Sequence, residues 1–411
     1  MLSAKKPRSA RALANDRLIR DAGVAEILRV GVDQLSLRDV GQRAGFTHGA
    51  TYARYEDVDE LIVDLWASVL CERASLIVEL CRRGADRPSP EATRAIIDFV
   101  RQASPDDVAA LHVLLTARRI PAVFEEIEPF IVDVLRGEEA ADPLAGAAHT
   151  RALAVFALLI ALILANHHFG PNPNDLIVLE TILNDTFDAD LSGDRIELQE
   201  ANVQFVPAPT EELKSQLAYA TFMVIGKSGY THTTISRIAR RAGCSPGLVY
   251  KLYDSKVDLV VSAFRNSLNA RWMRADNQAR ILDEGHLAQS LYDTTSPVNA
   301  VRRNFVLEFS LAGVRVPEIH AAVLQQTLDL VATVDFLDAT PDERDVVISV
   351  VRTIAFLTTG VTYLSAACDV LHCENLSQFT EPFRRSARAL CGAQWDARRD
   401  LLMKFANEAS A

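Results

Sequence analysis

The sequence predicts an all-α protein built from two similar halves. Apolar residues recur at three- and four-residue spacing through most of the 411 positions, and no segment shows the alternation of a strand. Prolines stand near the starts of these periodic segments, where a missing amide proton is harmless: Pro90, Pro105, Pro121, Pro143, Pro297, Pro317 and Pro341. The chain also repeats itself, because a shift of 198 positions aligns residues 17–62 with 215–260 without a gap and with ten identical pairs.

Composition indicates a globular protein of more than one domain, with 49% apolar and 24% charged residues. The six cysteines form no CxxC pair, so neither a disulfide framework nor a structural zinc site is predicted, and a reducing cytoplasm fits. The basic N-terminus has no apolar stretch behind it, so we expect no signal peptide. The most apolar run, Ala152 to Ala165, is shorter than the roughly 20 residues that span a bilayer, and we interpret it as a buried core helix.

The repeated segment has the pattern of a helix, a glycine-containing turn and a second helix. In the second half, Thr234 can cap a first helix that stops at Gly243, and Ser245 can cap the next, with Pro246 in its first turn. The first half repeats the pattern with Ser36 and Thr47 as caps and Gly45 in the turn. Tyr55 and Tyr253 follow, and we expect both to anchor the core of their small domain. This is the layout of a helix-turn-helix.

Positive charge concentrates in the two repeated segments. The net charge of −11 argues against a nucleic-acid partner when taken alone. Residues 1–56 nevertheless carry ten basic against six acidic side chains, and residues 213–256 carry seven against one. Such a distribution is what neutralisation of a DNA backbone requires.

The segment "RRAGCSPGLVYKLYDSK" from Arg240 resembles the N-terminal domain of the TetR family of regulators, and "QRAGFTHGATYARYEDV" from Gln42 is similar up to Tyr55. The resemblance implies a DNA-binding transcriptional regulator, in this family commonly a repressor released by a small ligand, and no enzyme. It also implies a two-fold dimer of helical halves. It supports phosphate contacts by the tyrosines of the second helix and by Lys256, which matches a phosphate-contacting lysine of the family.

Groove geometry and phosphate chemistry select the residues that would contact double-stranded DNA. They are Ser36, Thr47, His48, Gly49, Ala50, Thr51 and Tyr52 in the first half, and Thr234, Ser245, Pro246, Gly247, Leu248, Tyr250, Lys251 and Lys256 in the second.

The first half departs from the pattern after Tyr55. Val58 stands where the second half has Lys256, among the acidic residues Glu56, Asp57, Asp59 and Glu60. A basic N-terminal arm could compensate by reaching the DNA backbone, or could be a solubilising tail; it comprises Lys5, Lys6, Arg8, Arg11, Arg17 and Arg20. The alternative function is therefore a helical sensor or scaffold whose first helix-turn-helix no longer binds DNA.

We expect each half to pair a three-helix DNA-binding domain with a helical ligand and dimerisation domain. The predicted boundaries are 1–62 and 63–202 for the first half, 203–210 for a proline-containing linker, and 211–262 and 263–411 for the second half. The helices Arg151–His168, Asp175–Phe187, Arg352–Leu371 and Leu376–Leu390 would join the halves as an intrachain pseudo-dimer, unless two chains pair as a homodimer.

A small apolar ligand could bind between helices of either half. The candidate lining residues are Phe99, Leu114, Phe124, Phe156 and Leu159, and Phe305, Phe309, Phe336, Phe356 and Tyr363, although aromatic stripes at helical spacing are more often plain core. Gly243 to Gly247 satisfies GxSxG, but a nucleophile elbow must follow a strand, and a basic helix is expected there. His167 with His168, and Cys368 with His372 and Cys373, lack the partners of a metal site, so no metal or cofactor is predicted.

Overall fold

The computed structural model describes residues 10–136, 143–188, 210–272, 284–332, 340–368, 371 and 380–392. Within these residues every regular element is a helix, which confirms the predicted all-α class. Phe336, the prolines of the expected linker and the arm residues Lys5, Lys6 and Arg8 lie outside the described residues.

The first half runs from the N-terminal helix α1 to α10. Its elements are α1 Ala10–Val30, η1 Val32–Gln34, α2 Leu37–Arg43, α3 His48–Tyr52, α4 Val58–Leu65, η2 Trp66–Leu70, α5 Cys71–Asp86, α6 Pro90–Arg101, α7 Pro105–Thr116, η3 Ala117–Arg119, α8 Pro121–Pro129, η4 Phe130–Arg136, α9 Pro143–Phe169 and α10 Pro173–Asp188.

The second half contains a similar series of helices. Its elements are α11 Leu213–Ser228, α12 Ile235–Arg241, α13 Pro246–Val249, α14 Lys256–Trp272, α16 Glu284–Thr295, η5 Pro297–Asn299, α17 Ala300–Gly313, α18 Pro317–Ala332, α19 Pro341–Ala367 and α20 Thr380–Cys391. The bounds of α2 and α12 differ by 198 positions, as do those of the 27-residue helices α9 and α19. Chain segments at the spacing of the sequence repeat therefore take the same local structure.

Proline and serine fix several helix starts. Each of the seven prolines singled out in the sequence is the first residue of a helix. Ser89 and Ser104 cap α6 and α7 by accepting a hydrogen bond from a backbone N–H of the first turn, and Asp107 completes a capping box with Ser104. These local signals explain why the starts of these helices follow the sequence so closely.

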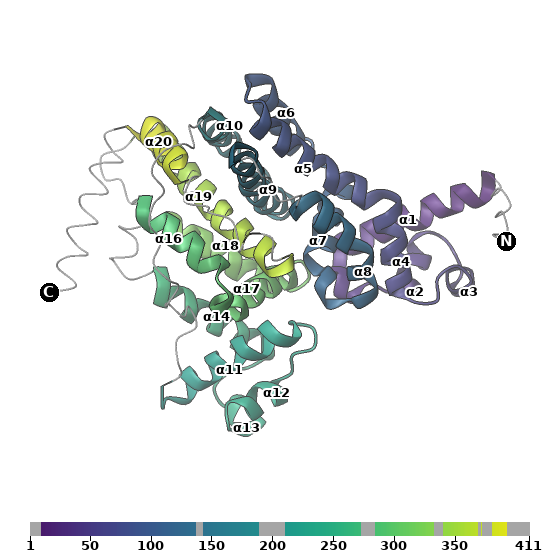
Figure 1. The fold of residues 1–411 in the computed structure, drawn as a ribbon. Coiled ribbons are helices and arrows are strands. Elements are labelled where there is room, and N and C mark those ends of the chain that lie inside the picture. The colour runs from purple at the N-terminus through teal and green to yellow at the C-terminus, as the bar shows by residue number, and fades with distance from the viewer. Residues whose placement is uncertain are drawn as a thin grey trace.

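The halves are held together by the long helices α9 and α19, which pack along each other in the centre of the molecule (Figure 1). Residues Ala152 to Leu164 of α9 are all buried. Gly360 of α19 lies so close to α9 that a Cβ there would overlap the carbonyl oxygen of Ala157. Segments of both helices are long and apolar enough to span a membrane, but 83% and 61% of those segments are buried inside the protein. They are core helices, as predicted for the apolar run.

The shorter helices α10 and α20 complete the contact between the halves. Ser386 Oγ of α20 donates a 2.5 Å hydrogen bond to Asp185 Oδ2 of α10. Arg352 of α19 forms a 3.0 Å ion pair with the buried Asp175 of α10. The helices expected to join the halves therefore do pack against one another. Of the predicted Leu376–Leu390 helix, the described part begins at Thr380.

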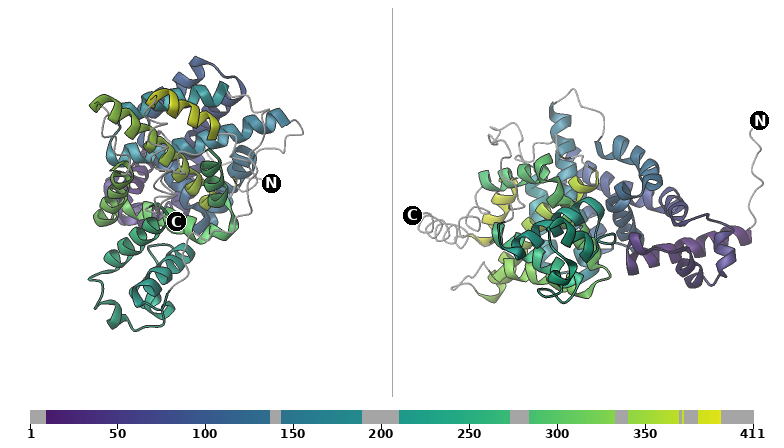
Figure 2. Two further views of the ribbon diagram at one scale, coloured as in Figure 1. Left: turned by 90° about the vertical axis from the view of Figure 1, so that its left-hand side faces the viewer. Right: turned by 90° about the horizontal axis from the view of Figure 1, so that it is seen from below.

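Both candidate DNA-binding units project from this common body. Helices α1 to α4 lie at one end of the molecule, and α11 to α13 form a separate lobe beneath the central helices (Figures 1 and 2). Among the described residues, Leu217, Ile238, Val249 and Leu259 make a core cluster of their own within the second lobe.

Candidate nucleic-acid interface

The second unit, α11 to α14, is a helix-turn-helix closed by local hydrogen bonds. Thr234 caps α12 by accepting from Arg237 N at 3.3 Å, and Ser245 caps α13 by accepting from Leu248 N at 3.3 Å. Between the two helices Gly243 adopts φ 70°, a left-handed conformation that glycine takes without a steric penalty. The turn predicted from the sequence is therefore present. Because α12 precedes Gly243 where a nucleophile elbow needs a strand, the GxSxG resemblance carries no hydrolase site.

The first unit, α1 to α4, reproduces this geometry. Ser36 caps α2 by accepting from Asp39 N at 3.1 Å, and Gly45 adopts φ 76° in the turn. Thr47 precedes α3 in an extended conformation, although its side chain makes no capping hydrogen bond. Two further glycines at the ends of α1 and α11, Gly31 and Gly229, share φ 77°.

Helix α13 and the residues that flank it present an exposed surface. Tyr250 is 58% exposed and Leu248 is 38% exposed, while Val249 between them is fully buried and holds the helix in place. The remaining predicted contact residues of this helix are exposed as well: Ser245, Pro246, Gly247 and Lys251. The equivalent Tyr52 of α3 is 46% exposed, and Thr47, Gly49 and Ala50 are also exposed. The side chain of His48 lies outside what the structure describes.

Thr51 is a correction to the predicted interface. Its side chain is fully buried, with the hydroxyl pressed against Gly41 of α2, where a Cβ would overlap it. Thr51 therefore packs α3 against α2 and does not face a groove. The sequence pattern missed this because α3 is too short for its inward and outward faces to be separated by periodicity.

Ser36 is a second correction, because its hydroxyl is used twice inside its own helix cap. It accepts from Asp39 N and donates to Asp39 Oδ2 at 2.8 Å. Its only hydroxyl proton is therefore committed to a carboxylate rather than to a phosphate. Thr234 and Ser245 accept from backbone N–H groups, which leaves their hydroxyl protons for an outside acceptor.

Lys256 is a third correction. Its Nζ donates to the carbonyl oxygens of Tyr230 and Thr233, each at 3.2 Å, and lies 4.0 Å from the centroid of the Tyr230 ring. Burial lowers the pKa of this half-buried ammonium, with a smaller contribution from Arg315. Lys256 thus fastens α14 to the loop before α12 and does not point outward to a phosphate. The pattern identified the position but not the direction of the side chain.

Many basic side chains of the first unit form ion pairs with carboxylates of the same unit. The count of basic and acidic residues in the sequence did not reveal these pairs. Arg29 and Arg43 both bind the buried carboxylate of Glu26, at 2.6 and 2.5 Å, and Arg54 pairs with Asp16. Burial alone would raise the pKa of Glu26, but the hydrogen bonds from the two arginines lower it. These cations therefore hold the domain together and leave less charge for DNA.

Arg20, predicted as part of the basic arm, is also paired. It contacts Asp64 at 2.9 Å, and Tyr55 donates to the same carboxylate at 2.8 Å. Burial and this hydrogen bond raise the pKa of Tyr55 to about 12. Tyr55 and Tyr253 are 5% and 7% exposed, which confirms both as core anchors.

The second unit keeps its positive charge on the surface. Arg240, Arg241 and Lys251 are exposed, and no carboxylate among the described residues pairs with them. Arg237, also exposed, donates to the carbonyl oxygen of His232 at 2.7 Å. The helix-turn-helix of the second half is therefore the more cationic of the two as folded.

A network of polar side chains links the two units to each other. Arg119 Nη1 binds Asp33 of the first unit at 2.8 Å and Glu308 of α17 at 2.8 Å. Glu308 in turn accepts from Tyr230 N of the second unit at 2.9 Å. Thr231 donates to Asp33 at 3.3 Å, although these two residues lie 198 positions apart.

Arg315 occupies the position that mirrors Arg119 in this network. It donates to Thr231 Oγ1 at 2.6 Å and lies 3.3 Å from where a Cβ of Gly31 would be. Arg119 lies 3.2 Å from the corresponding point on Gly229. Each arginine thus reaches the glycine turn of the opposite half. We call Asp33, Arg119, Thr231, Glu308 and Arg315 the junction. The signal in the sequence that could have indicated it is that Arg119 and Arg315 each stand two residues before the proline that begins a helix.

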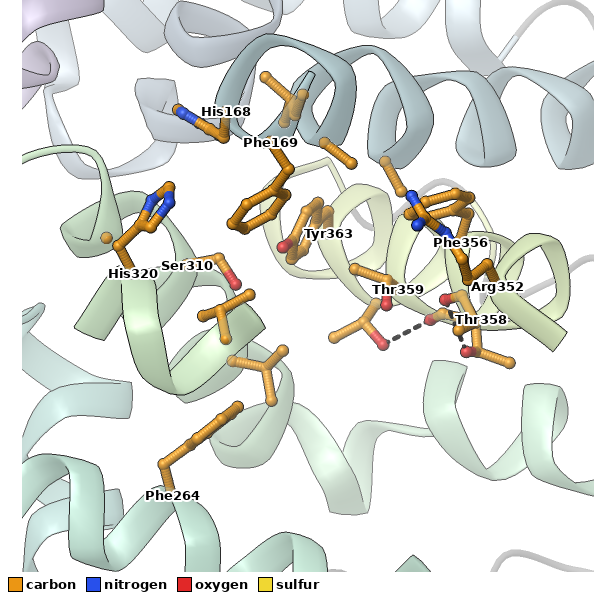
Figure 3. A pocket seen from close by; sticks show the side chains of 18 of the residues that line it. His168, Phe169, Phe264, Ser310, His320, Arg352, Phe356, Thr358, Thr359 and Tyr363 are labelled. Atoms are coloured by element: carbon orange, nitrogen blue, oxygen red, sulfur yellow. Dashed lines mark hydrogen bonds between the residues drawn. The ribbon is translucent and has the colours of Figure 1, made fainter. Parts of the chain in front are cut away.

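Most of the residues predicted to line a ligand pocket belong to the packed core. Phe356 and Tyr363 do border a cavity (Figure 3). Leu114, Phe156, Leu159, Phe305 and Phe309 are buried core residues, and Phe99 and Phe124 pack against the core. The plain-core alternative is therefore correct for the first-half residues. Within the described residues no group of three or more metal-ligating side chains occurs, and the cluster at Cys368 lies partly outside them.

Residues 219–263 match the family model described as bacterial regulatory proteins of the tetR family. The matched segment runs from α11 into α14, so it covers the whole helix-turn-helix of the second unit. No curated protein matches the chain. The second unit is thus similar to the helix-turn-helix domain of tetR-family regulatory proteins.

Proposed function

We propose that the chain is a cytoplasmic, sequence-specific transcriptional regulator that binds double-stranded DNA through the second helix-turn-helix and, more weakly, through the first. The observation that carries the proposal is the exposed surface of α13 and the residue after it, where Leu248 and Tyr250 protrude from a cationic lobe. An α-helix of this kind fits the major groove, with hydroxyl and cationic groups placed at the flanking phosphates.

We also propose that the chain is a tandem duplication in which one polypeptide supplies both halves of a pseudo-dimer, with domains 1–62, 63–202, 211–262 and 263–411. The matching helix bounds, the paired glycine turns and the reciprocal arginines of the junction support it. Because α3 and α13 differ in sequence, a monomer would prefer an asymmetric site. Light scattering that shows a requirement for a second chain would favour the homodimer instead.

Regulation by a small molecule is the third part of the proposal, with repression relieved on binding. Helix α14 begins beside the recognition helix at Lys256 and carries Phe264 to the wall of the cavity. A ligand that binds one arrangement of these helices better than another would shift DNA affinity by that difference.

One set of observations favours the alternative in which the first unit no longer binds DNA. Arg20, Arg29, Arg43 and Arg54 are engaged by carboxylates of their own domain, which leaves fewer cations for DNA. In that case the first half would serve as a structural partner for the second.

Selection of bound duplexes from a random pool, followed by titration of the selected DNA, tests both versions. Tyr250→Ala in α13 should weaken binding about 10- to 100-fold, whereas Tyr52→Ala in α3 tests the first unit with an equivalent side chain. An unchanged affinity for Tyr250→Ala would overturn the interface. An effect of Tyr250→Ala combined with none for Tyr52→Ala would establish the one-unit alternative.

A further inference from the structure

The structure contains a cavity of about 160 Å³ between the two halves (Figure 3). Helix α9 of the first half provides Ala161, Leu164, Ala165 and the pair His168 and Phe169. The rest of the wall comes from the second half, from α14, α17, α18 and α19 and the end of α16. The cavity is therefore a shared site, formed only where the halves meet.

The polar part of the wall consists of cations and hydroxyl groups. Arg302 and Arg352 line the cavity together with Ser310 and a row of threonines on α19, and none of the lining residues is an aspartate or glutamate. Arg302 is only 6% exposed. A wall of this composition favours a ligand that accepts hydrogen bonds and carries negative charge.

Arg352 brings an unused hydrogen-bond donor to the cavity wall, although the Asp175 carboxylate pairs with the same guanidinium. One of its terminal nitrogens pairs with the buried carboxylate of Asp175 at 3.0 Å. Its Nε–H is buried and has no hydrogen-bond acceptor among the described residues. A buried donor without an acceptor is costly, and a ligand oxygen would satisfy it.

The apolar part of the wall is large enough for one small hydrocarbon body. Phe264, Phe356, Val306 and Leu164 line it, and the guanidinium of Arg352 lies 5.7 Å from the centre of the Phe356 ring. An engineered apolar cavity of about 150 Å³ accommodates a benzene ring. His168 and His320, with ring centres 6.2 Å apart, close the opposite end, and burial lowers the pKa of His168 to about 4, so it is neutral there.

We propose that this cavity binds one small monocarboxylate with an apolar body, such as an aromatic or short-chain acid, per chain, with the carboxylate held by Arg352 and the hydroxyl group of Thr359 on α19. The inference deepens the proposed function, because this molecule would be the regulatory ligand. Its position between α9 and α19 gives it contact with both halves at once. One binding event would therefore act on both DNA-binding units.

Isothermal titration calorimetry on the full chain without DNA tests the proposal with benzoate against benzamide, and hexanoate against hexanamide. Each pair has nearly the same shape and differs in charge. We expect a stoichiometry of one and at least about tenfold tighter binding of each anion than of its amide. Equal affinities, two sites per chain, or no binding of either acid at roughly 10 mM would overturn the proposal.

Two variants locate the site. The double variant Arg352→Met with Asp175→Asn removes both members of the ion pair, so no buried charge is left unpaired, and should abolish the preference for the anion. Ala165→Leu should fill the cavity and weaken acid and amide alike by about tenfold or more. Arg385→Met, on the exposed face of α20, is the control for lost charge and should bind as the unchanged chain does. A preference retained in the double variant would exclude Arg352 as the carboxylate partner.

Binding to selected DNA is measured separately by gel shift. If the chain binds benzoate but no DNA, the proposed function is overturned and the proposed ligand site stands. If it binds DNA but shows no preference for acids, the ligand site is overturned and the DNA-binding function stands.

Discussion

His112 shows how burial of one residue links stability to pH. It lies on α7, is 2% exposed, and faces His168, whose ring centre is 6.0 Å away and which in turn contacts His167 and His320. Burial lowers the pKa of His112 to about 3, with smaller contributions from His168 and His167. The folded protein therefore keeps His112 neutral at a pH where the unfolded chain binds a proton.

We predict that the free energy of unfolding falls as pH decreases from about 6.5 toward 4. In this window the unfolded state binds more protons at His112 and His168 than the folded state, so the free energy of unfolding rises with pH. Protonation of each histidine in the unfolded chain should lower the free energy of unfolding at pH 5 by on the order of 2 kcal/mol relative to neutral pH. His112→Phe should roughly halve the slope that these two groups contribute, measured by urea unfolding at several pH values. A slope as steep as in the unchanged chain would show that other groups dominate.

Lys256 illustrates a residue whose sequence context suggests one role and whose contacts give it another. Because its Nζ binds two carbonyl oxygens of its own domain, we predict that Lys256→Met lowers the free energy of unfolding by about 1 kcal/mol. The salt dependence of DNA binding should stay the same. The exposed Lys251 is the matched control: Lys251→Met should leave stability unchanged and reduce the salt slope by about one. If Lys256→Met reduces the salt slope without lowering stability, and Lys251→Met does not reduce it, Lys256 is a phosphate contact after all.

At the scale of elements, the close approach of α9 and α19 depends on Gly360. A side chain there would overlap the Ala157 carbonyl oxygen, so Gly360→Ala must separate the helices and should destabilise the fold by about 2 to 3 kcal/mol. Gly146, in α9, has no neighbour within 4 Å of an added Cβ, and Gly146→Ala should stabilise by about 0.5 to 1 kcal/mol. Urea unfolding followed by circular dichroism compares the two. Similar effects for both glycines would mean that helix propensity, not the crossing, governs Gly360.

Local signals predicted the elements well because their causes are local. Proline at the first helical position, serine or threonine caps and glycine in the turn act within one helical turn, and the helix starts follow them. The charge of the first unit could not be predicted in this way. Whether Arg43 faces DNA or Glu26 depends on a partner 17 residues away, which periodicity does not specify. The direction of Lys256 and the burial of Thr51 were likewise set by tertiary contacts.

The cavity could not be predicted from the sequence for a related reason. Its wall combines helices from both halves, so it depends on how α9 meets α19 rather than on the pattern of either helix alone. Aromatic periodicity selected Phe356 and Tyr363, which line the cavity, together with Phe156 and Phe309, which do not. The cationic residue Arg352 was not among the predicted pocket residues. Arginine on a mostly apolar helix was the signal that would have indicated it.

At the scale of the whole molecule, the junction is the structure that fixes one DNA-binding unit relative to the other. Its central carboxylate, Glu308, has a side chain only 7% exposed and depends on Arg119 and on Tyr230 N for its partners. Burial raises the pKa of Glu308, while Arg119 and the Tyr230 hydrogen bond lower it in part. Loss of Arg119 would leave a buried charge without its cation.

We predict that Arg119→Met destabilises the chain by roughly 3 kcal/mol and that Glu308→Gln added to it recovers much of the loss, because the double variant buries no uncompensated charge. The single and double variants together also distinguish an effect on stability from an effect on the spacing of the two DNA-binding units. With Arg119 gone, Asp33 of the first unit loses the cation that joins it to Glu308 of α17, so the two units should be held less tightly at one spacing. Gel shifts on duplexes whose two half-sites are separated by increasing lengths should then show a broader spacing preference for the double variant than for the unchanged chain. If stability recovers and the spacing preference stays as narrow as before, the packing of α9 against α19, and not the junction, sets the distance between the two units.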